Sequence, residues 1–340
     1  MIKYRLFKNC DIPQLVEIWR ENAQRPEYAG LEMMPMNYYT LDSFVLSKEY
    51  FSHNHVLCAV ETQPAPPDTA SGFPRENVVG FIHGGFGPTP DYNGVSYESG
   101  VICLCLVRPR EDEFQIARGL IQGMEKIFQN LGVKNIYAGA VYPYAPFYVG
   151  LLPGGGLHGI LECDPILPNI LPGEKYDVVS RNHLFRISLG SYTQTGRLKL
   201  ARLRELFFIS HREFEAENWW DKSSMRLLKC LQFRMIERKT NQEVAHLLTQ
   251  AAHISQATQE NDSDGGKKTY IRNVFVREEF RRKGYARFLV SSVLEFLKAT
   301  EVRTVELQIP EDKNIAFHVF PSPAFARFAT GAVYKKQYEG

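Results

Sequence analysis

VFVREEFRRKGYA, residues 274–286, is the stretch from which the fold of this chain can be inferred. It closes an alternating apolar run that predicts a strand from Tyr270 to Val276. After a short charged turn, residues with helical apolar spacing predict a helix from Arg282 to Ala299. Arg303 to Ile309 alternates again. The stretch therefore forms the first turn of a predicted strand–helix–strand unit.

This turn is suited to bind an anion. The N-terminus of a helix presents unpaired backbone N–H groups and about half a positive charge. Gly284 lets a phosphate approach the main chain without a Cβ in the way, and Arg281, Arg282 and Lys283 add positive charge beside it. We therefore expect a phosphate-bearing ligand here, although an ordinary solvated basic face would explain the three cations too.

The same residues resemble the coenzyme A motif of the GNAT superfamily of N-acetyltransferases. The motif is Arg or Gln, two residues, Gly, one residue and then Gly or Ala, and Arg281, Gly284 and Ala286 fit it. The resemblance implies acetyl-coenzyme A as cosubstrate, with its pantetheine arm on the strand and its pyrophosphate on amides from Arg282 to Arg287. The cofactor-binding residues implied in this way are Val274, Phe275, Val276, Arg281, Arg282, Lys283, Gly284, Tyr285, Ala286, Arg287 and Asn314.

The length of 340 residues favours two domains of roughly 150 to 190 residues. Residues 1–189 and 190–340 both show an order of elements similar to that of the GNAT superfamily. We expect an α/β (α+β) fold with two GNAT-like domains, each a mixed, mostly antiparallel central sheet flanked by helices. Further expected elements are strands 2–7, 55–60, 78–83, 99–107, 135–140, 233–236 and 244–248, with helices 12–19 and 113–130 and a helical region 197–229.

An internal repeat supports two related domains. The two halves overlay without a gap, at one constant offset, from Ile271 on Ile102 to Ile309 on Ala140. The apolar stripe of the second helix, which begins at Ala286, keeps the phase of the stripe that begins at Ala117. Shared strand–helix–strand periodicity explains part of this similarity, but a duplicated domain explains the continuous register as well.

The matching turn of the first half has the opposite charge. Asp112 stands where Arg281 does, and Glu111 to Glu113 places three consecutive carboxylates at a helix start. These charges favour the helix dipole but repel a phosphate. We expect that the first half is degenerate and has lost tight coenzyme A binding.

The residues that move protons are less clearly marked. Many GNAT enzymes use a tyrosine after the fifth strand as the acid, yet no tyrosine lies between Tyr285 and Tyr334. His318 and Tyr334 are the candidate substitutes, and a water molecule is another. Glu306, which alternates with apolar neighbours on the fifth strand, is the candidate base, with a surface carboxylate as the alternative. We therefore take Glu306 and His318 as the candidate catalytic residues.

Composition limits the partners. The chain is 44% hydrophobic and 23% charged with a formal net charge of +2, so nothing in its overall charge favours nucleic acid or anionic lipid. The six cysteines contain no metal-ligand spacing, so we expect no metal and mostly buried, reduced thiols. The N-terminus lacks an apolar leader and no window would span a bilayer, which favours a cytoplasmic protein.

The leading hypothesis is a tandem GNAT enzyme that transfers an acetyl group from acetyl-coenzyme A to a primary amine of a small molecule or peptide. The second half would carry the reaction. A non-catalytic acyl-coenzyme A sensor is the alternative, favoured by the missing tyrosine. Nucleic-acid binding through the basic turn is a third reading, but no nucleic-acid motif accompanies it.

Overall fold

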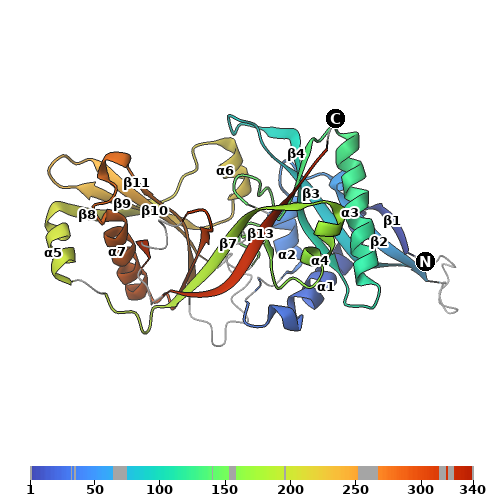
Figure 1. The fold of residues 1–340 in the computed structure, drawn as a ribbon, viewed down its shortest axis with the longest axis horizontal. Helices are drawn as coiled ribbons and strands as arrows, with labels where there is room; N and C mark the ends of the chain where they lie inside the picture. The colour runs from blue at the N-terminus through green and yellow to red at the C-terminus, as the bar shows by residue number, and fades with distance from the viewer. Residues whose placement is uncertain are drawn as a thin grey trace. The chain divides into compact units, whose positions relative to one another are not determined.

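The computed structural model describes residues 2–31, 33, 36–63, 75–139, 141–152, 158–194, 197–251, 267–313, 319–320 and 325–338. The chain divides into two compact units, whose elements are labelled in Figure 1. Unit 1 contains residues 1–179, 218–226 and 331–340, and unit 2 contains residues 180–217 and 227–330. The boundary between residues 189 and 190 stays a prediction about the two family domains.

Unit 1 is built on a sheet with the strand order β1-β2-β3-β4-β5-β13. Only β4 and β5 pair in parallel; the other neighbours are antiparallel. The strands are β1 (Ile2–Leu6), β2 (Val56–Gln63), β3 (Arg75–Pro88), β4 (Val95–Val107), β5 (Asn135–Ala138) and β13 (Ala326–Gln337), and β6 (Ile160–Leu161) also pairs with β13. The helices are α1 (Ile12–Ala23), α2 (Tyr38–Leu41), α3 (Glu113–Asn130), α4 (Leu167–Ile170) and α6 (Trp219–Ser224).

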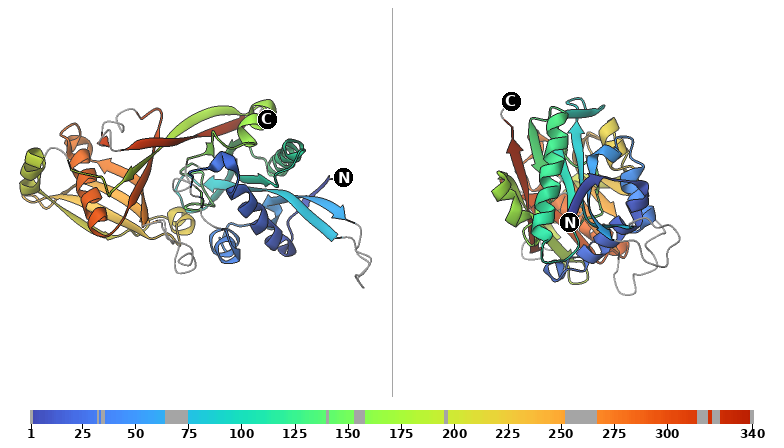
Figure 2. Two further views of the ribbon diagram at one scale, coloured as in Figure 1. Left: turned by 90° about the horizontal axis from the view of Figure 1, so that it is seen from below. Right: turned by 90° about the vertical axis from the view of Figure 1, so that its right-hand side faces the viewer.

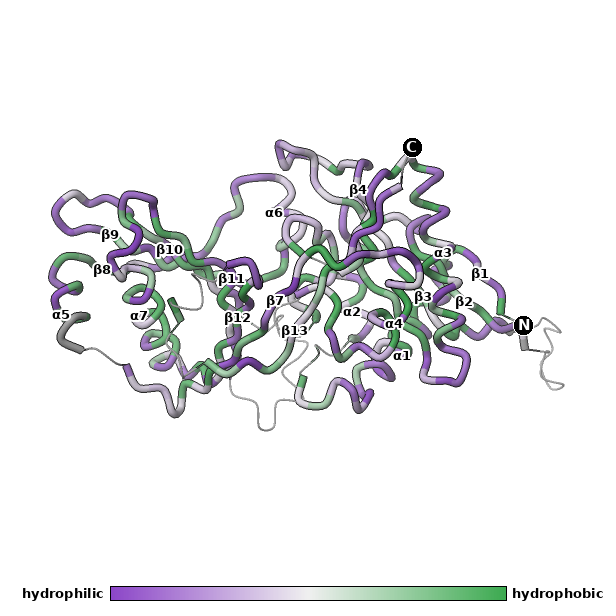
Figure 3. The backbone as a smooth tube through the Cα atoms, in the orientation of Figure 1, coloured by the Kyte–Doolittle hydropathy of each residue, from purple (hydrophilic) through white to green (hydrophobic). Residues whose placement is uncertain are grey.

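The core of unit 1 lies between its sheet and α3. Hydrophilic and hydrophobic residues alternate along this helix (Figure 3), and Leu120, Ile121, Met124 and Phe128 of its apolar side are fully buried. Helix α1 packs against β3 and β4 on the other face of the sheet (Figure 2). The predicted strand–helix–strand unit of the first half is thus confirmed.

Unit 2 repeats this plan with the strand order β8-β9-β10-β11-β12-β7, in which β11 and β12 are the parallel pair. Helix α7 packs against β10 and β11 over a second apolar core. The strands are β7 (Asp177–Ser188), β8 (Phe207–Glu213), β9 (Cys230–Glu237), β10 (Glu243–Ala251), β11 (Lys268–Val276) and β12 (Thr304–Pro310). The helices are α5 (Arg197–Leu206) and α7 (Tyr285–Ala299).

The internal repeat is confirmed residue by residue. In unit 1 the parallel pairing runs from Ser99 opposite Asn135 to Ile102 opposite Ala138. In unit 2 it runs from Lys268 opposite Thr304 to Ile271 opposite Leu307. Both partners of every pair are displaced by the same offset that relates the two halves of the sequence, so the two halves share one strand register.

The helical region predicted for residues 197–229 is confirmed at α5 and at α6 but is wrong between them. Residues 207–213 form β8, which pairs antiparallel with β9 from Phe207 opposite Glu237 to Glu213 opposite Leu231. The many charged residues of this region resemble a solvated helix, but Phe207, Phe208 and Ile209 favour a strand and find an open sheet edge. Tertiary pairing overrides the local pattern here.

Helix α6 belongs to unit 1 although it lies between two strands of unit 2 in the sequence. Trp220 is 1% exposed and stacks on Tyr50 with ring centroids 5.4 Å apart. Lys48 donates to the backbone oxygens of Ser223 and Ser224 at the end of the helix, both at 2.6 Å. Burial, with the nearby Arg226 charge, lowers the pKa of Lys48 to about 7. Trp220 is therefore a core residue of unit 1.

Four of the six cysteines (Cys58, Cys103, Cys105 and Cys230) are buried, and all six are free thiols, as expected. None of the helices that the structure describes combines the length and apolar character needed to cross a membrane.

A buried histidine links the strands of unit 1 to the segment after β5. His83 is 1% exposed, and its Nδ1 lies 2.8 Å from the hydroxyl of Tyr148. Within the described residues its Nε2 has no hydrogen-bond partner. Burial, with a smaller contribution from His55, lowers the pKa of His83 to about 3. The imidazole is therefore neutral in the folded protein at neutral pH.

This histidine predicts a specific loss of stability in acid. Because the folded-state pKa lies below the unfolded value of about 6.5, the unfolded chain binds the proton first. The contribution of His83 to the free energy of unfolding is fully present above about pH 6.5. It falls as the pH is lowered toward 3, by at most about 1.4 kcal/mol per pH unit. Urea unfolding between pH 4 and 7 should show a shallower pH dependence for His83→Gln than for the wild type. Equal slopes would show that His83 is not responsible.

Candidate functional site

The site begins where two parallel strands of unit 2 separate. Pairing between β11 and β12 ends at Ile271 and Leu307. Strand β11 continues to Val276 with β10 on one edge, and no strand within the described residues pairs with Val274 to Val276 on the other. Phe275, in the middle of this segment, is 41% exposed. One edge of the segment from Val274 to Val276 is therefore not paired with a described strand, and its role in binding a ligand stays a prediction.

The turn after β11 has a fixed shape. Arg281 Nε donates to the carbonyl oxygen of Val276 at 3.0 Å, and Lys283 Nζ donates to that of Glu279 at 3.0 Å. Gly284 has φ 83°, a left-handed conformation that a glycine adopts without strain. Arg282 has φ 61°, an uncommon conformation for a residue with a Cβ. The side chains that looked like free cations therefore hold the turn as well.

Helix α7 starts directly after this turn. Gly284 is its N-cap, and the helix ladder begins with the amide of Phe288 donating to the Gly284 oxygen at 3.1 Å. The amides of Tyr285, Ala286 and Arg287 precede that bond, where a helix has no intrahelical acceptors. The residues from Arg281 to Gly284 are exposed. The structure thus brings together every predicted cofactor-binding residue from Val274 to Arg287 at an open, positively charged helix start.

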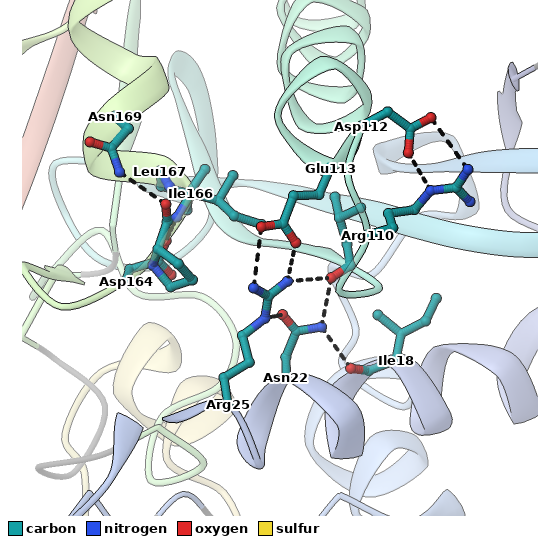
Figure 4. A network of polar contacts seen from close by, with 12 residues as sticks. Ile18, Asn22, Arg25, Arg110, Asp112, Glu113, Asp164, Ile166, Leu167 and Asn169 are labelled. Carbon is teal, nitrogen blue, oxygen red and sulfur yellow. Dashed lines mark hydrogen bonds and ion pairs between the residues drawn. The ribbon is translucent and has the colours of Figure 1, made fainter. Parts of the chain in front are cut away.

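The equivalent turn of unit 1 is closed by its own side chains (Figure 4). The oxygen of Val107, the counterpart of Val276, accepts from Asn22 at 3.0 Å and from Arg25 at 3.1 Å. Arg25, which is 8% exposed, also forms an ion pair with Glu113 at 2.5 Å. Arg110 is paired with Asp112. The turn of unit 1 is therefore closed by contacts that the turn of unit 2 lacks among the described residues.

The separation of β4 from β5 in unit 1 is also filled. Gly159 and Ile160 of the β6 region lie so close to Gly139 that a Cβ there would come within 2.8 Å of the Ile160 nitrogen. The cavity that remains beside β4 measures about 60 Å³. This volume holds at most a few water molecules. In unit 1, the acidic turn at residues 111–113 thus occurs together with a filled separation between β4 and β5.

Glu306 lies in unit 2 near the strand separation, but it is 1% exposed. Its carboxylate is 2.7 Å from Arg186 Nε and 3.3 Å from Lys268 Nζ, on the two neighbouring strands. The alternative that Glu306 is a surface carboxylate is therefore wrong. Two cations stabilise its negative charge, which is the arrangement of a structural ion-pair cluster; its catalytic role stays a prediction.

The remaining candidates for cofactor binding and proton transfer lie outside the open end of β11 or outside the described residues. Asn314 and His318 lie outside the described residues. Tyr334 is buried in the core of unit 1, where it pairs with Ala138, and so is not part of unit 2. Tyr148 is 2% exposed, in the contact with His83 described above. Tyr148 is therefore a packed aromatic residue.

His246 on β10, which from the sequence alone is a weaker candidate base than Glu306, gains support from its position in the structure. Its ring stacks on that of Phe275 with centroids 5.0 Å apart, and its Nδ1 lies 3.0 Å from a carboxylate oxygen of Glu243. It is the imidazole that the described structure places beside the open part of β11. The observed pairing of β10 with β11 sets His246 opposite Phe275, and the sequence alone does not give this register. The sequence did not predict that Asn22 and Arg25 bind the Val107 oxygen in unit 1, because both residues lie far from Val107 in the chain.

Residues 209–320 match the model of the acetyltransferase (GNAT) family. Solved structures are similar over 99% of this chain. A GCN5-related glucosamine N-acetyltransferase region of a fungal multi-domain GH3 beta-N-acetylglucosaminidase has 13% identity and a TM-score of 0.66, and the chain covers 38% of that longer protein. Among curated proteins, none matches the chain.

Two further structures resemble the chain over nearly their own full lengths. A tandem GNAT protein from the clavulanic acid biosynthesis pathway has 11% identity and a TM-score of 0.61, with 98% of it covered. A GCN5-related N-acetyltransferase from Sphaerobacter thermophilus has 13% identity and a TM-score of 0.54, with 95% covered. The fold is that of a tandem GNAT protein. Residues 209–320 are thus similar in sequence to the acetyltransferase (GNAT) family, and the chain as a whole shares the tandem GNAT fold.

The ion-pair cluster of unit 2 gives a stability prediction. Glu306→Ala would leave Arg186 and Lys268 without their shared carboxylate, and should lower the free energy of unfolding by about 2 kcal/mol or more. Glu306→Gln should cost less, because it keeps an acceptor for Arg186. Glu301→Ala, which removes the exposed partner of Lys267, should have almost no effect. Urea unfolding measures all three. A Glu306→Ala protein as stable as the wild type would contradict this account.

Proposed function

We propose that the protein is an N-acetyltransferase that moves the acetyl group of acetyl-coenzyme A to a primary amine of a small molecule or peptide. Residues 190–340 would bind the donor and carry the reaction, and residues 1–189 would serve as a degenerate scaffold domain. The protein would act in the cytoplasm. The observation that carries the proposal is the open start of α7 beside the unpaired end of β11, compared with the closed turn in unit 1.

The chemistry requires little from the donor site beyond position. The neutral amine nitrogen attacks the thioester carbonyl, the C–S bond breaks, and the thiolate leaves. A base must take the ammonium proton, and an acid or water protonates the thiolate. Main-chain groups of Val274 to Val276 would hold the pantetheine arm, and amides from Arg282 to Arg287 the pyrophosphate. Asn314 would add a contact to the cofactor.

Three residues are candidates for proton transfer. Glu306 and His318 are the predicted ones, and His246 has the support of its place beside Phe275 and of its Glu243 partner. A histidine hydrogen-bonded to a carboxylate is oriented to accept a proton through its other nitrogen. A rate that falls in His246→Gln but not in His318→Gln would favour His246 as the base.

Donor binding should depend on one glycine of the second half and not on its counterpart. Gly284→Glu adds bulk, negative charge and strain at φ 83°, and should weaken acetyl-coenzyme A binding by about 100-fold. Gln115→Glu makes the same charge change at the matching position of the first half and should leave affinity unchanged. Calorimetry should give one molecule bound per chain. Two molecules per chain, or unchanged affinity in Gly284→Glu, would overturn the assignment.

Product formation separates a transferase from an acyl-coenzyme A sensor. The protein should release free coenzyme A when acetyl-coenzyme A is supplied with a panel of primary amines. Amino sugars belong in this panel, because one structure of the same fold is described as a glucosamine N-acetyltransferase region. Confirmed binding without turnover on any amine would favour the sensor.

A further inference from the structure

Unit 1 carries a second hollow that has no part in the proposed donor site. It lies between the β3–β4 hairpin and the segment that follows β5, and its volume is about 210 Å³. Its walls include two aromatic rings, three proline rings and one carboxylate. We call it the tyrosine pocket, and these residues are Tyr92, Tyr144, Pro88, Pro90, Pro143 and Glu98.

Both tyrosines of the pocket are fixed by stacking. Tyr144 stacks on Tyr137 with centroids 4.7 Å apart and 15° between the ring planes, and Tyr92 stacks on Tyr142 at 6.3 Å and 17°. Gly87 makes room for Tyr144, since a Cβ there would lie 2.5 Å from its ring. The rings are therefore preorganised, so a ligand would lose little energy in ordering them.

The charged group that lines the pocket is a carboxylate, and the other polar lining residues described are neutral. The carboxylate of Glu98 has no ion pair or hydrogen bond to any residue that the structure describes. Burial first, and then neighbouring groups that include Glu98, raises the pKa of Tyr144. Asp221 of α6 raises the pKa of Tyr142 in the same way, after burial, and its Oδ1 lacks a partner among the described residues. Two carboxylates thus lie near the tyrosine cluster, and neither forms an ion pair within the part of the chain that the structure describes.

One face of the cluster already attracts a cation. Lys335 Nζ lies 5.6 Å from the centre of the Tyr137 ring, which in turn stacks on Tyr144. Aromatic rings with a nearby carboxylate are the surroundings in which proteins bind organic ammonium ions, and no lysine or arginine is among the described residues that line the pocket itself. Proline walls add apolar contact without adding a competing charge.

We propose that the tyrosine pocket binds a small organic cation, a ligand with an ammonium group, with Glu98 as its counter-ion and the rings of Tyr92 and Tyr144 as its walls. This inference does not rest on the proposed acetyl transfer. The pocket has room for a compact ammonium compound but not for a coenzyme.

A charged ligand and its neutral isostere provide the test. Choline and 3,3-dimethylbutan-1-ol have nearly the same shape, but only choline carries a positive charge. In ligand-observed NMR titrations at constant ionic strength, choline should bind at least about fivefold more tightly than the alcohol. Equal affinity for the two ligands, or no saturable binding of choline at millimolar concentrations, would overturn the proposal.

Variants locate the binding within unit 1. Glu98→Gln should weaken choline binding by about threefold to tenfold and leave the alcohol unchanged. Tyr92→Asn, which suits the left-handed φ of 58° at this position, should weaken both ligands. Glu27→Gln, a change at another exposed carboxylate, is the matched control and should have no effect. An unaltered choline affinity in Glu98→Gln would exclude this pocket as the site.

Discussion

The parallel contact between β11 and β12 lasts for four residue pairs, and the site of unit 2 depends on where it stops. Up to Ile271 the two strands satisfy each other's backbone groups. Beyond it, the last residues of β11 keep only one partner, and the helix that starts at Gly284 has amides of its own without acceptors. A sheet edge and a helix start therefore meet at one point, where backbone groups remain that the strand pairing and the helix ladder do not satisfy.

The two halves show what such a point requires. They share one register and one strand order, so the frame is the same. In unit 1, Asn22 and Arg25 supply the missing hydrogen bonds and Arg25 neutralises Glu113. In unit 2, Arg281 binds the equivalent carbonyl from within the turn, and the amides beyond it stay exposed. The difference between a closed and an open site thus lies in a few side chains.

Much of the fold could be predicted because its signals are local or repeated. The apolar period located α3 and α7, and the constant offset between the halves indicated a duplicated domain. The sequence did not predict β8, because its charged residues are also typical of a solvated helix. Residues 207–213 form a strand because they pair with the free edge of β9. The sequence also could not place Tyr334 in unit 1 or Arg25 at Val107. Those contacts depend on residues far apart in the chain, for which periodicity carries no information.

The last strand of each sheet comes from the opposite half of the sequence. Unit 1 ends its sheet with β13, and unit 2 ends its sheet with β7. A ribosome makes the first half long before residues 331–337, so the sheet of unit 1 cannot be completed while the second half is still being synthesised. The sheet of unit 1 therefore reaches its full width only after residues 331–337, near the end of the given sequence, have been made.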